Sequence, residues 1–314
     1  MEMEIIKYSR FKPLGRIGAS VAMGNFDGIH LGHKSVIELA KTNGESMEFG
    51  VLTFTPHPRE FFSPENKHFK LMNYQTKILT LKKLNLDILI EIPFNASLSK
   101  LEPEIFAREI LHRNLCLGHV VVGSDFRFGK NRIGDAESLA RFGERYGFKV
   151  TVAPLKQING LEISSTAIRK LLREGQTEKA ATMLGDWYKI AGKVIKGDQR
   201  GRELGFPTIN ISLENLHLPK YGVYTSSVEV LSGKHKGNYE AVVSIGERPT
   251  YGINSPNLEA HLIEFTGNLY NTEVLVELKK FQRPEVKFLS SSDLKNQMLA
   301  DLALAKVFHQ DFTK

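Results

Sequence analysis

Apolar and polar positions follow different periods in the two halves of the chain. In the first half, short and nearly continuous apolar runs lie at residues 21–23, 49–54, 88–92 and 119–123. Apolar side chains recur every three or four positions at residues 31–41, 76–84, 103–113 and 136–146. Apolar strands that alternate with helices are typical of a parallel sheet covered on both faces. The first half is therefore predicted to be an α/β domain whose ligands bind beyond the carboxyl ends of its strands.

The second half shows the period of two that half-buried β-strands produce. Strands are predicted at residues 188–195, 223–230, 239–245, 259–265 and 273–279. Several short strands in succession indicate an antiparallel barrel that is closed or nearly closed. A final helix is predicted from Ser291 or Ser292, with one apolar stripe formed by Leu294, Met298, Leu302 and Ala305. The change of period near Gly185 predicts two domains, residues 1–184 and 185–314.

Length and composition agree with two globular domains. At 314 residues the chain exceeds a comfortable single core. Its 41% hydrophobic and 25% charged residues are ordinary for a soluble globular protein. The net charge of +7 suits an anionic ligand, such as a nucleotide, a nucleic acid or a membrane surface. The Lys and Arg residues are scattered and form no block, which argues against a nucleic-acid-binding tail.

The sequence also predicts a cytoplasmic location. Cys116 is the single cysteine and cannot form an intramolecular disulfide, as is expected in a reducing compartment. The N-terminal stretch lacks the basic start and the long apolar core of a signal peptide. No apolar run approaches the length of about 20 residues that crosses a membrane.

The string G-N-F-D-G-I-H-L-G-H at residues 24–33 is the first candidate site. It connects a predicted strand to a predicted helix, and its two histidines would project from one side of the first helical turn. Free backbone N–H groups at a helix start favour a polyphosphate, and imidazoles can stabilise the charge on a leaving pyrophosphate. The candidate ATP-binding residues are Gly24, Asn25, Phe26, His30 and His33. The histidines could equally cap or pack the helix, or bind a metal together with His57.

Residues 121–135 form a second candidate site in the first half. They end a predicted strand and combine aromatic, acidic and basic side chains with glycines, which suits a flat ring that carries a phosphate. The candidates are Asp125, Phe126, Arg127 and Phe128. A surface turn explains the same composition equally well. The sequence contains no G-x-G-x-x-G and no Walker A string, so an ordinary NAD-type or P-loop site is excluded.

Residues 163–175 begin with hydroxyl side chains and continue as a predicted helix. Ser165 and Thr166 lie at the helix start and Arg169 lies one turn later, where the three can hold a phosphate. Ser and Thr at a helix start are also fully explained as N-caps, because they accept hydrogen bonds from free N–H groups.

Residues 196–211, K-G-D-Q-R-G-R-E-L-G-F-P-T-I-N-I, form a glycine-rich basic loop that runs into a strand. The candidates for a phosphate cradle in this loop are Gly197, Arg200, Gly201 and Arg202. Thr208 and Asn210 lie two positions apart on an extended segment, so they point the same way and offer hard oxygens that suit Mg²⁺. As a lone pattern, the loop could also be a mobile hairpin.

These strings resemble those of the bacterial bifunctional riboflavin kinase/FMN adenylyltransferases, also called FAD synthetases, over nearly the whole chain. The first half shares G-N-F-D-G-x-H-x-G-H, T-F-x-P-H-P, V-V-G-x-D-F-R-F-G and S-S-T-x-I-R with that family. The second half has G-F-P-T-I-N, where the family usually has G-F-P-T-A-N, and then G-E-R-P-T-Y-G, L-E-A-H-L-I-E-F, G-N-L-Y and R-P-E-V-K-F. The chain departs from the family at Asp186-Trp187, where Arg-Pro is common, and at Asn271, where glycine usually follows Tyr270.

The resemblance implies a Rossmann-like nucleotidyltransferase domain followed by a riboflavin kinase barrel with a terminal helix. It makes Glu259 the base that accepts the riboflavin hydroxyl proton, and His30 and His33 the catalytic residues of the first domain. Ser165, Thr166 and Arg169 would clamp the ATP triphosphate from the side opposite the two histidines. The predicted flavin-binding residues are His57, Asp125, Phe126, Arg127, Phe128, Arg283 and Glu285.

The resemblance also implies two reactions. The barrel would phosphorylate riboflavin to FMN with ATP and Mg²⁺, and the first domain would transfer AMP from a second ATP to FMN, giving FAD and pyrophosphate. The expected partners are these small molecules, with no nucleic acid and no membrane, and the sequence leaves the oligomeric state open. Two alternatives remain at this stage. A metal-dependent hydrolase built on His30, His33 and His57 would hold a transition metal tightly, and a non-catalytic flavin-sensing or nucleic-acid-binding module would bind without turnover.

Overall fold

The computed structural model of the chain describes residues 3–8, 18–44, 46–197, 201, 204–248 and 255–312. The chain divides into two compact units. The first unit comprises Met1–Asn66 and Ile78–Ser164, and the second comprises Lys67–Lys77 and Ser165–Lys314. Residues 165–184 therefore lie with the second unit, while the boundary of the catalytic domains after residue 184 stays a prediction.

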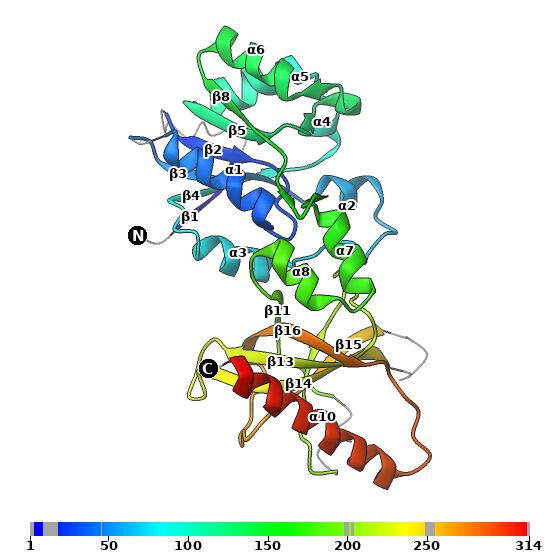
Figure 1. Ribbon diagram of the computed structural model, residues 1–314. Helices are drawn as coiled ribbons and strands as arrows, with labels where there is room; N and C mark the ends of the chain where they lie inside the picture. Colours follow the sequence, from blue (N-terminus) through cyan, green and yellow to red (C-terminus); the bar gives the residue numbers. More distant parts are fainter. Residues whose placement is uncertain are drawn as a thin grey trace. The chain divides into compact units, whose positions relative to one another are not determined.

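A six-stranded parallel sheet forms the centre of the first unit (Figure 1). Its strands are β1 (Glu4–Lys7), β2 (Ser20–Met23), β3 (Phe49–Thr55), β4 (Ile88–Pro93), β5 (His119–Gly123) and β8 (Lys149–Ala153). They lie in the order β1-β4-β3-β2-β5-β8, and every neighbouring pair is parallel. Val120, Val121 and Val122 are all fully buried, and because successive side chains point to opposite faces, both faces of the sheet are covered. The predicted α/β fold is confirmed.

The sequence pattern does not predict the two edge strands of this sheet, β1 and β8. Three of the four residues of β1 are exposed, and β8 buries only Ala153 fully. An edge strand has a neighbour on one side only, so it lacks the continuous apolar run that marks a central parallel strand.

The helices of the first unit agree with the predicted positions in three cases and differ in one. They are α1 (Leu31–Thr42), α2 (Pro58–Phe62), α3 (Tyr74–Lys82, which begins in the second unit), α4 (Ala96–Ser99), α5 (Pro103–Ile105), η1 (Phe106–Asn114) and α6 (Ala136–Tyr146). The single helix predicted over residues 103–113 is a short α-turn followed by the π-helix η1, which ends with the Leu115 N–H donating to the Ile110 carbonyl at 2.9 Å. The buried residues Phe106, Ala107, Ile110 and Leu111 recur at a spacing of four, which an α-helix would also show, so the pattern cannot distinguish the two helix types.

The second unit is built on a six-stranded antiparallel sheet. Its strands are β11 (Tyr188–Lys193), β12 (Ile209–Ser212), β13 (Gly222–Val230), β14 (Gly237–Arg248), β15 (Ser255–Leu262) and β16 (Glu273–Arg283), in the order β11-β16-β13-β14-β15-β12. The two edge strands approach each other, because the Ile195 N–H donates to the Asn210 carbonyl at 2.9 Å. A Cβ on Gly192 would lie 2.3 Å from Ile211, so strands β11 and β12 pass very close to each other here. The sheet is a nearly closed barrel, as predicted.

Among the described residues, the helices that lie wholly within the second unit include α7 (Ser165–Arg173), α8 (Thr177–Leu184) and α10 (Ser291–Phe312). Helices α7 and α8 are joined to the barrel by hydrogen bonds from the Thr177 hydroxyl to the Lys279 carbonyl at 2.8 Å and from the Lys220 N–H to the Leu172 carbonyl at 2.9 Å. Helix α10, drawn in red in Figure 1, lies across β13 and β14. Its buried side includes Asp301 and Ala305.

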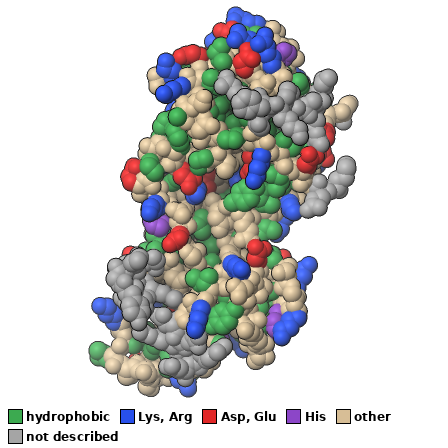
Figure 2. Space-filling model, turned by 180° about the vertical axis from the view of Figure 1, so that it is seen from behind, with side chains coloured by type: hydrophobic (Ala, Val, Ile, Leu, Met, Phe, Trp, Pro, Cys, Tyr) green, Lys and Arg blue, Asp and Glu red, His purple; other side chains and the backbone are tan. Residues whose placement is uncertain are grey.

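Short elements connect these parts: β6 (Arg127–Phe128), η2 (Lys130–Arg132), β7 (Gly134–Asp135), β9 (Gln157–Ile158) and β10 (Leu161–Glu162). Basic and acidic side chains of the described residues are interspersed over the face seen in Figure 2, as the scattered sequence positions predict. Within the part of the chain that the structure describes, every helix is too short or too polar to span a bilayer.

Candidate active sites

The glycine- and histidine-rich loop follows β2 at the carboxyl edge of the parallel sheet. The Gly24 N–H donates to the Leu52 carbonyl at 3.1 Å, and the ring of Phe26 folds back so closely that a Cβ on Gly24 would lie 3.3 Å from it. Phe26 has a positive φ of 50° and is 1% exposed. The buried ring therefore fixes the path of the loop into α1, while Asn25 remains exposed beside it.

His30 is the N-cap of α1, and its ring stacks on the ring of His33. The His30 Nδ1 atom accepts a hydrogen bond from the His33 N–H at 3.2 Å, and the two ring centroids lie 3.6 Å apart at an interplanar angle of 17°. Because Nδ1 accepts, the proton of a neutral His30 ring is on Nε2. The capping explanation and the phosphate-binding explanation are thus compatible, since capping uses only the Nδ1 atom of the ring.

Three candidate segments share one edge of the first unit. Residues 24–33 follow β2, His57 follows β3, and residues 124–128 follow β5. The order β3-β2-β5 makes these strands neighbours, and all three are parallel, so their carboxyl ends lie together. Ligands of open α/β sheets bind at this edge. The fold therefore gathers segments that lie up to about a hundred residues apart in sequence.

His57 begins α2 and caps it, because its Nδ1 atom accepts a hydrogen bond from the Arg59 N–H at 3.0 Å. The metal-dependent hydrolase alternative required His57 to form a cluster with His30 and His33. Across the described residues, no group of three or more His, Cys, Asp or Glu side chains is arranged to hold a metal ion. These three histidines, all of them described, therefore do not form the cluster that this alternative needs.

The stretch after β5 contains one core residue and three accessible ones. Phe128 is 6% exposed and packs against Phe106 with a centroid distance of 5.7 Å. Phe126 stacks on Phe128 at 5.6 Å and is half-buried, whereas Asp125 and Arg127 are exposed. The buried Phe128 ring thus supports the Phe126 ring. Phe126 and the charged side chains of Asp125 and Arg127 are the groups that a ligand can reach.

The predicted phosphate-binding residues Ser165, Thr166 and Arg169 lie on the first two turns of α7, in the second unit. Ser165 and Thr166 begin the helix, and the Arg169 Nε atom donates to the Phe69 carbonyl at 2.5 Å. The Arg169 guanidinium also lies 5.8 Å from the centre of the Phe69 ring. Segment 67–77 therefore holds part of this guanidinium, and the predicted triphosphate clamp stays a prediction.

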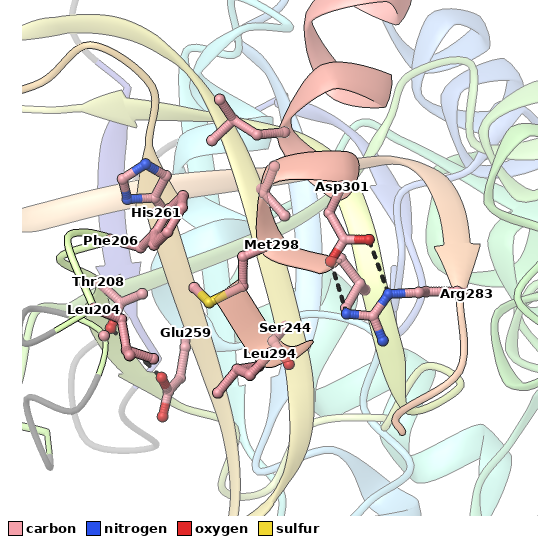
Figure 3. A pocket seen from close by; sticks show the side chains of 14 residues that line it. Leu204, Phe206, Thr208, Ser244, Glu259, His261, Arg283, Leu294, Met298 and Asp301 are labelled. Atoms are coloured by element: carbon pink, nitrogen blue, oxygen red, sulfur yellow. Dashed lines mark hydrogen bonds and ion pairs between the residues drawn. The ribbon is translucent and has the colours of Figure 1, made fainter. Parts of the chain in front are cut away.

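The barrel carries a cavity of about 250 Å³ on its outer face, beneath α10 (Figure 3). Val242, Ser244 and Glu259 line it, and they alternate along their strands with core residues that point to the opposite side of the sheet. Helix α10 supplies an apolar wall of Leu294, Met298 and Leu302, which are three of the four residues of the predicted stripe. The complete lining comprises Gly201, Leu204, Phe206, Thr208, Val223, Val242, Ser244, Glu259, His261, Arg283, Leu294, Met298, Asp301 and Leu302.

Three predicted residues meet beside this cavity, and two of them, Thr208 and Glu259, line it. The register of β12 and β15 pairs Asn210 with Glu259, and the Thr208 hydroxyl lies 3.5 Å from the Glu259 carboxylate, to which it donates. Asn210 is 4% exposed, and its Oδ1 atom accepts a hydrogen bond from the Asn257 side chain at 3.0 Å. A hydroxyl, an amide oxygen and a carboxylate form the hard oxygen set that Mg²⁺ prefers, so the residues present fit this ion.

The glycine-rich loop before β12 is described only in part. Gly201 lines the cavity, and a Cβ on it would lie 2.4 Å from the Phe206 carbonyl, so only glycine fits this turn without displacement. The Phe206 N–H donates to the Gly201 carbonyl at 2.7 Å and closes the loop. Gly197 is half-buried and is not part of the cavity lining, and Arg200 and Arg202 lie outside the described residues.

Two predicted flavin-binding residues lie at or just beyond the end of β16, and one of them, Arg283, has a charged protein partner. Arg283 lines the cavity and makes a two-pronged ion pair with Asp301, with Nε and Nη2 at 2.8 and 2.7 Å from the carboxylate oxygens (Figure 3). Glu285 lies against the backbone of Gly246, where an added Cβ would be 2.0 Å from its carboxylate. Burial raises the pKa of the Glu285 carboxyl, and the nearby charge of Glu247 raises it further.

The two departures from the family pattern have structural explanations. Asn271 has a φ of 65°, a left-handed conformation that glycine adopts freely and asparagine tolerates. Asp186 accepts hydrogen bonds from the Trp187 N–H and from Lys189, whose ammonium also lies 3.3 Å from Glu277. Burial lowers the pKa of Lys189, but its hydrogen bond to Asp186 and the charge of Glu277 raise this pKa overall.

Sequence reasoning missed four polar or aromatic residues of the barrel cavity, Phe206, Ser244, His261 and Asp301, and it placed Met298 on the helix stripe but not in the site. A signal existed for His261, which follows Glu259 by two positions and therefore shares its side of the strand. A weaker signal existed for Asp301, which is a buried acid on the apolar side of a helix. Ser244 and Phe206 have no distinguishing pattern, because their place at the cavity depends on strand pairing.

The fold and the two sites define a nucleotide-dependent transferase with two catalytic modules. The family model described as FAD synthetase matches residues 15–167, and the model described as riboflavin kinase matches residues 184–309. The Haemophilus influenzae bifunctional riboflavin kinase/FMN adenylyltransferase is 36% identical over 293 residues, covering 93% of this chain and 94% of that protein. The Buchnera aphidicola (Schizaphis graminum) enzyme of the same name is 37% identical over 295 residues, covering 92% and 94%. The chain belongs to the bifunctional riboflavin kinase/FMN adenylyltransferase family.

A solved structure is similar over nearly the whole length. It is a Streptococcus pneumoniae protein described as a macrolide-efflux protein, with a TM-score of 0.83 and 27% identity over 96% of this chain and 98% of its own. The predicted family, fold class and enzyme class are confirmed by the family models and the curated relatives. The same matches confirm ATP, riboflavin and FMN as the small molecules on which the enzyme acts.

Proposed function

We propose that the cavity beneath α10 is the riboflavin kinase site and that Glu259 is its general base. The observation that supports this best is the pairing of β12 with β15, by which Thr208, Asn210 and Glu259 meet beside an apolar cavity. A flat flavin ring requires apolar walls, and the wall residues Val223, Val242 and Met298 have this character. A carboxylate at the polar side is where the hydroxyl end of the substrate would need a proton acceptor.

In the proposed kinase reaction, each step is assigned to a side chain or backbone segment at this cavity. Glu259 accepts the proton of the riboflavin terminal hydroxyl as that oxygen attacks the γ-phosphorus of ATP, and ADP leaves. The Thr208 hydroxyl and the Asn210 amide oxygen would hold Mg²⁺, which would neutralise charge on the transferring phosphoryl group. Gly201 allows the loop backbone to approach the phosphates. The roles of Gly197, Arg200 and Arg202 in the same cradle, and of Arg283 and Glu285 toward the flavin, stay part of the proposal.

We propose that the loop after β2 in the first unit carries out the adenylyl transfer. The FMN phosphate attacks the α-phosphorus of ATP and pyrophosphate leaves. The backbone N–H groups at the start of α1 and the His30 and His33 rings stabilise the negative charge on the leaving pyrophosphate. The flavin would lie against the accessible part of the stretch after β5, with Phe126 as its stacking surface and Asp125 and Arg127 as its polar contacts.

Further parts of the proposal rest on the family resemblance and on composition. Ser165, Thr166 and Arg169 would bind the ATP phosphates, and His57 and Phe128 would complete the flavin site. The catalytic domains would divide after residue 184. We also infer a cytoplasmic location, supported by the single cysteine, Cys116, and by the intracellular supply of ATP that both reactions require.

Product analysis tests the function directly. Incubation of the purified chain with riboflavin, ATP and Mg²⁺ should yield FMN first and FAD later, and FMN supplied alone should yield FAD and one pyrophosphate per FAD. A non-catalytic flavin-binding module would retain riboflavin without forming either product. Replacement of Mg²⁺ by EDTA is the control, and elemental analysis of the untreated protein tests the metal-dependent hydrolase alternative, which requires a tightly bound transition metal.

A further inference from the structure

Strand β15 presents three polar side chains in a row toward the segment that carries the candidate Mg²⁺ ligands. Asn257, Glu259 and His261 alternate with the buried apolar residues Leu258, Ala260 and Leu262, so the three share one side of the strand. We call these three residues the β15 polar row. Glu259 has an assigned role in the proposed function, whereas nothing described so far explains the other two.

Each member of the β15 polar row contacts a different residue of segment 207–210. The Asn257 side chain donates to Asn210 Oδ1 at 3.0 Å, Glu259 accepts from the Thr208 hydroxyl at 3.5 Å, and His261 Nδ1 lies 2.9 Å from the Pro207 carbonyl oxygen. The contacts follow the antiparallel direction of the two strands. Segment 207–210 is therefore fastened by side chains as well as by backbone pairing.

The contact of His261 lies where backbone pairing ends. The register of β12 and β15 stops at the pair Ile209–Ala260, and Pro207 has no N–H with which to extend it. The His261 ring provides a hydrogen bond between the two segments at this point, because it donates to the Pro207 carbonyl. A carbonyl oxygen can only accept, so Nδ1 carries the proton in either charge state of the ring. The ring also packs edge-on against Phe206 at 5.5 Å, which holds the same turn from a second direction.

We propose that His261 is a positioning residue of the riboflavin kinase site, which holds the Phe206–Thr208 turn so that the Thr208 hydroxyl faces Glu259. Asn257 does the same for Asn210, because it fixes the side on which Asn210 Oδ1 lies. This inference rests on the proposed function, in which Thr208 and Asn210 bind Mg²⁺ and Glu259 is the base. Figure 3 shows the arrangement, with His261 beside Phe206 and with Thr208 near Glu259.

The test compares two substitutions of His261. His261→Phe keeps a ring against Phe206 and removes the donor, whereas His261→Asn keeps an N–H donor near the position of Nδ1 and removes the ring. Loss of a residue that orients a metal ligand typically costs 10- to 100-fold in metal affinity or activity. We expect His261→Phe to lower the kinase kcat by about 10- to 30-fold with riboflavin KM changed less than about threefold, and His261→Asn to recover most of that loss.

A binding measurement without turnover accompanies the kinetics. Calorimetric titration of ADP in Mg²⁺ and in EDTA gives the metal-dependent part of the ADP affinity. His261→Phe should reduce that part by about tenfold and leave the affinity in EDTA unchanged. Tyr239→Phe is the matched control, since it also removes one side-chain bond to a carbonyl, from Tyr239 to His235 at 2.9 Å in the β13–β14 hairpin outside the cavity. It should change neither quantity.

Three outcomes would overturn the inference. A His261→Phe enzyme with a lower Tm but normal kcat and normal metal-dependent affinity would show that His261 only stabilises the barrel. A His261→Asn enzyme as slow as His261→Phe would show that the imidazole itself is needed, as a proton-transfer group would be. Asn210→Ala distinguishes failure of the proposed function from failure of this inference. If Asn210→Ala leaves the metal-dependent ADP affinity intact, the proposed Mg²⁺ ligands are wrong. If Asn210→Ala abolishes that affinity and His261→Phe does not reduce it, only the positioning role of His261 is wrong.

Discussion

Arg283 and Asp301 form a two-pronged ion pair that ties α10 to the end of β16 at the wall of the barrel cavity. The Asp301 side chain is 3% exposed and that of Arg283 is 19% exposed. The Gln297 side chain adds a third hydrogen bond to the same carboxylate at 2.9 Å. Asp301 and three apolar residues of α10 line the cavity, so this ion pair determines where the apolar wall lies.

Asp301→Asn should therefore weaken both the fold and the substrate pocket. Removing one charge of a buried pair leaves the other uncompensated, so we expect the free energy of unfolding to fall by about 3 kcal/mol and riboflavin KM to rise about tenfold. Lys306→Ala is the control on the same helix. Its ion pair with Glu264 is exposed, at 40% and 80%, and its loss should cost less than about 1 kcal/mol. An unchanged riboflavin KM in folded Asp301→Asn would show that the ion pair does not set the pocket.

His33→Ala should separate the two activities. The ring stacks on His30 at the start of α1, and in the proposed function it stabilises the leaving pyrophosphate, so FAD formation from FMN should fall by roughly a hundredfold or more. FMN formation from riboflavin should persist, because the proposed kinase groups lie in the other unit. His112→Ala is a matched control, since His112 also stacks on a ring, that of Tyr146 at 6.1 Å, in the same unit. Equal loss of both activities in a folded His33→Ala protein would contradict this division of labour.

The sequence predicts the central strands and the final helix well, because each carries a pattern that burial imposes along the chain. It predicts the juxtaposition of Thr208 and Asn210 for the same reason, since two positions on a strand share a side. The edge strands β1 and β8 escape detection because an edge strand needs fewer apolar residues. The π-helix η1 escapes because its apolar positions resemble those of an α-helix.

The remaining parts of the site depend on pairings between segments far apart in the chain. Asp301 meets Arg283 only because α10 folds back over the sheet, and Phe206 meets His261 only because β12 pairs with β15. The placement of α8 with the barrel follows from one such contact, the bond from Thr177 to the Lys279 carbonyl. Local periodicity carries no information on these partners, so a sequence pattern alone could not predict them.

Glu259→Gln tests the central claim of the kinase proposal. Glutamine keeps the shape and the hydrogen-bonding capacity of the side chain but cannot accept the substrate proton, so the kinase rate should fall by about 10² to 10⁴ with little change in riboflavin affinity. FMN supplied directly should still be converted to FAD. Single-turnover FMN formation and thermal stability are measured on one preparation. A stable variant with near-normal kinase turnover would remove Glu259 from the mechanism, whereas a lower Tm with normal turnover would make it a structural residue.

His217 should make the second unit sensitive to acid. The side chain is 4% exposed, and its Nε2 atom donates to the Arg169 carbonyl at 3.0 Å. Burial lowers the pKa of His217 from 6.5 to about 4, and the charges of Arg169 and Arg173 act in the same direction, although hydrogen bonds to carbonyls oppose it. Below pH 6.5 the unfolded chain binds a proton at this residue that the folded protein does not bind.

The stabilising contribution of neutral His217 is therefore complete above pH 6.5 and is lost as the pH falls toward 4, by up to about 1.4 kcal/mol per pH unit and on the order of 3 kcal/mol in total. Urea denaturation of the wild type and of His217→Gln, at several pH values from 7.5 to 4, isolates this residue from the other buried histidines, which both proteins share. Glutamine retains a donor for the Arg169 carbonyl but does not titrate. As the pH falls from 7.5 to 4, the wild type should lose more unfolding free energy than His217→Gln does. If the difference between the two proteins stays constant over this range, His217 does not cause the acid sensitivity.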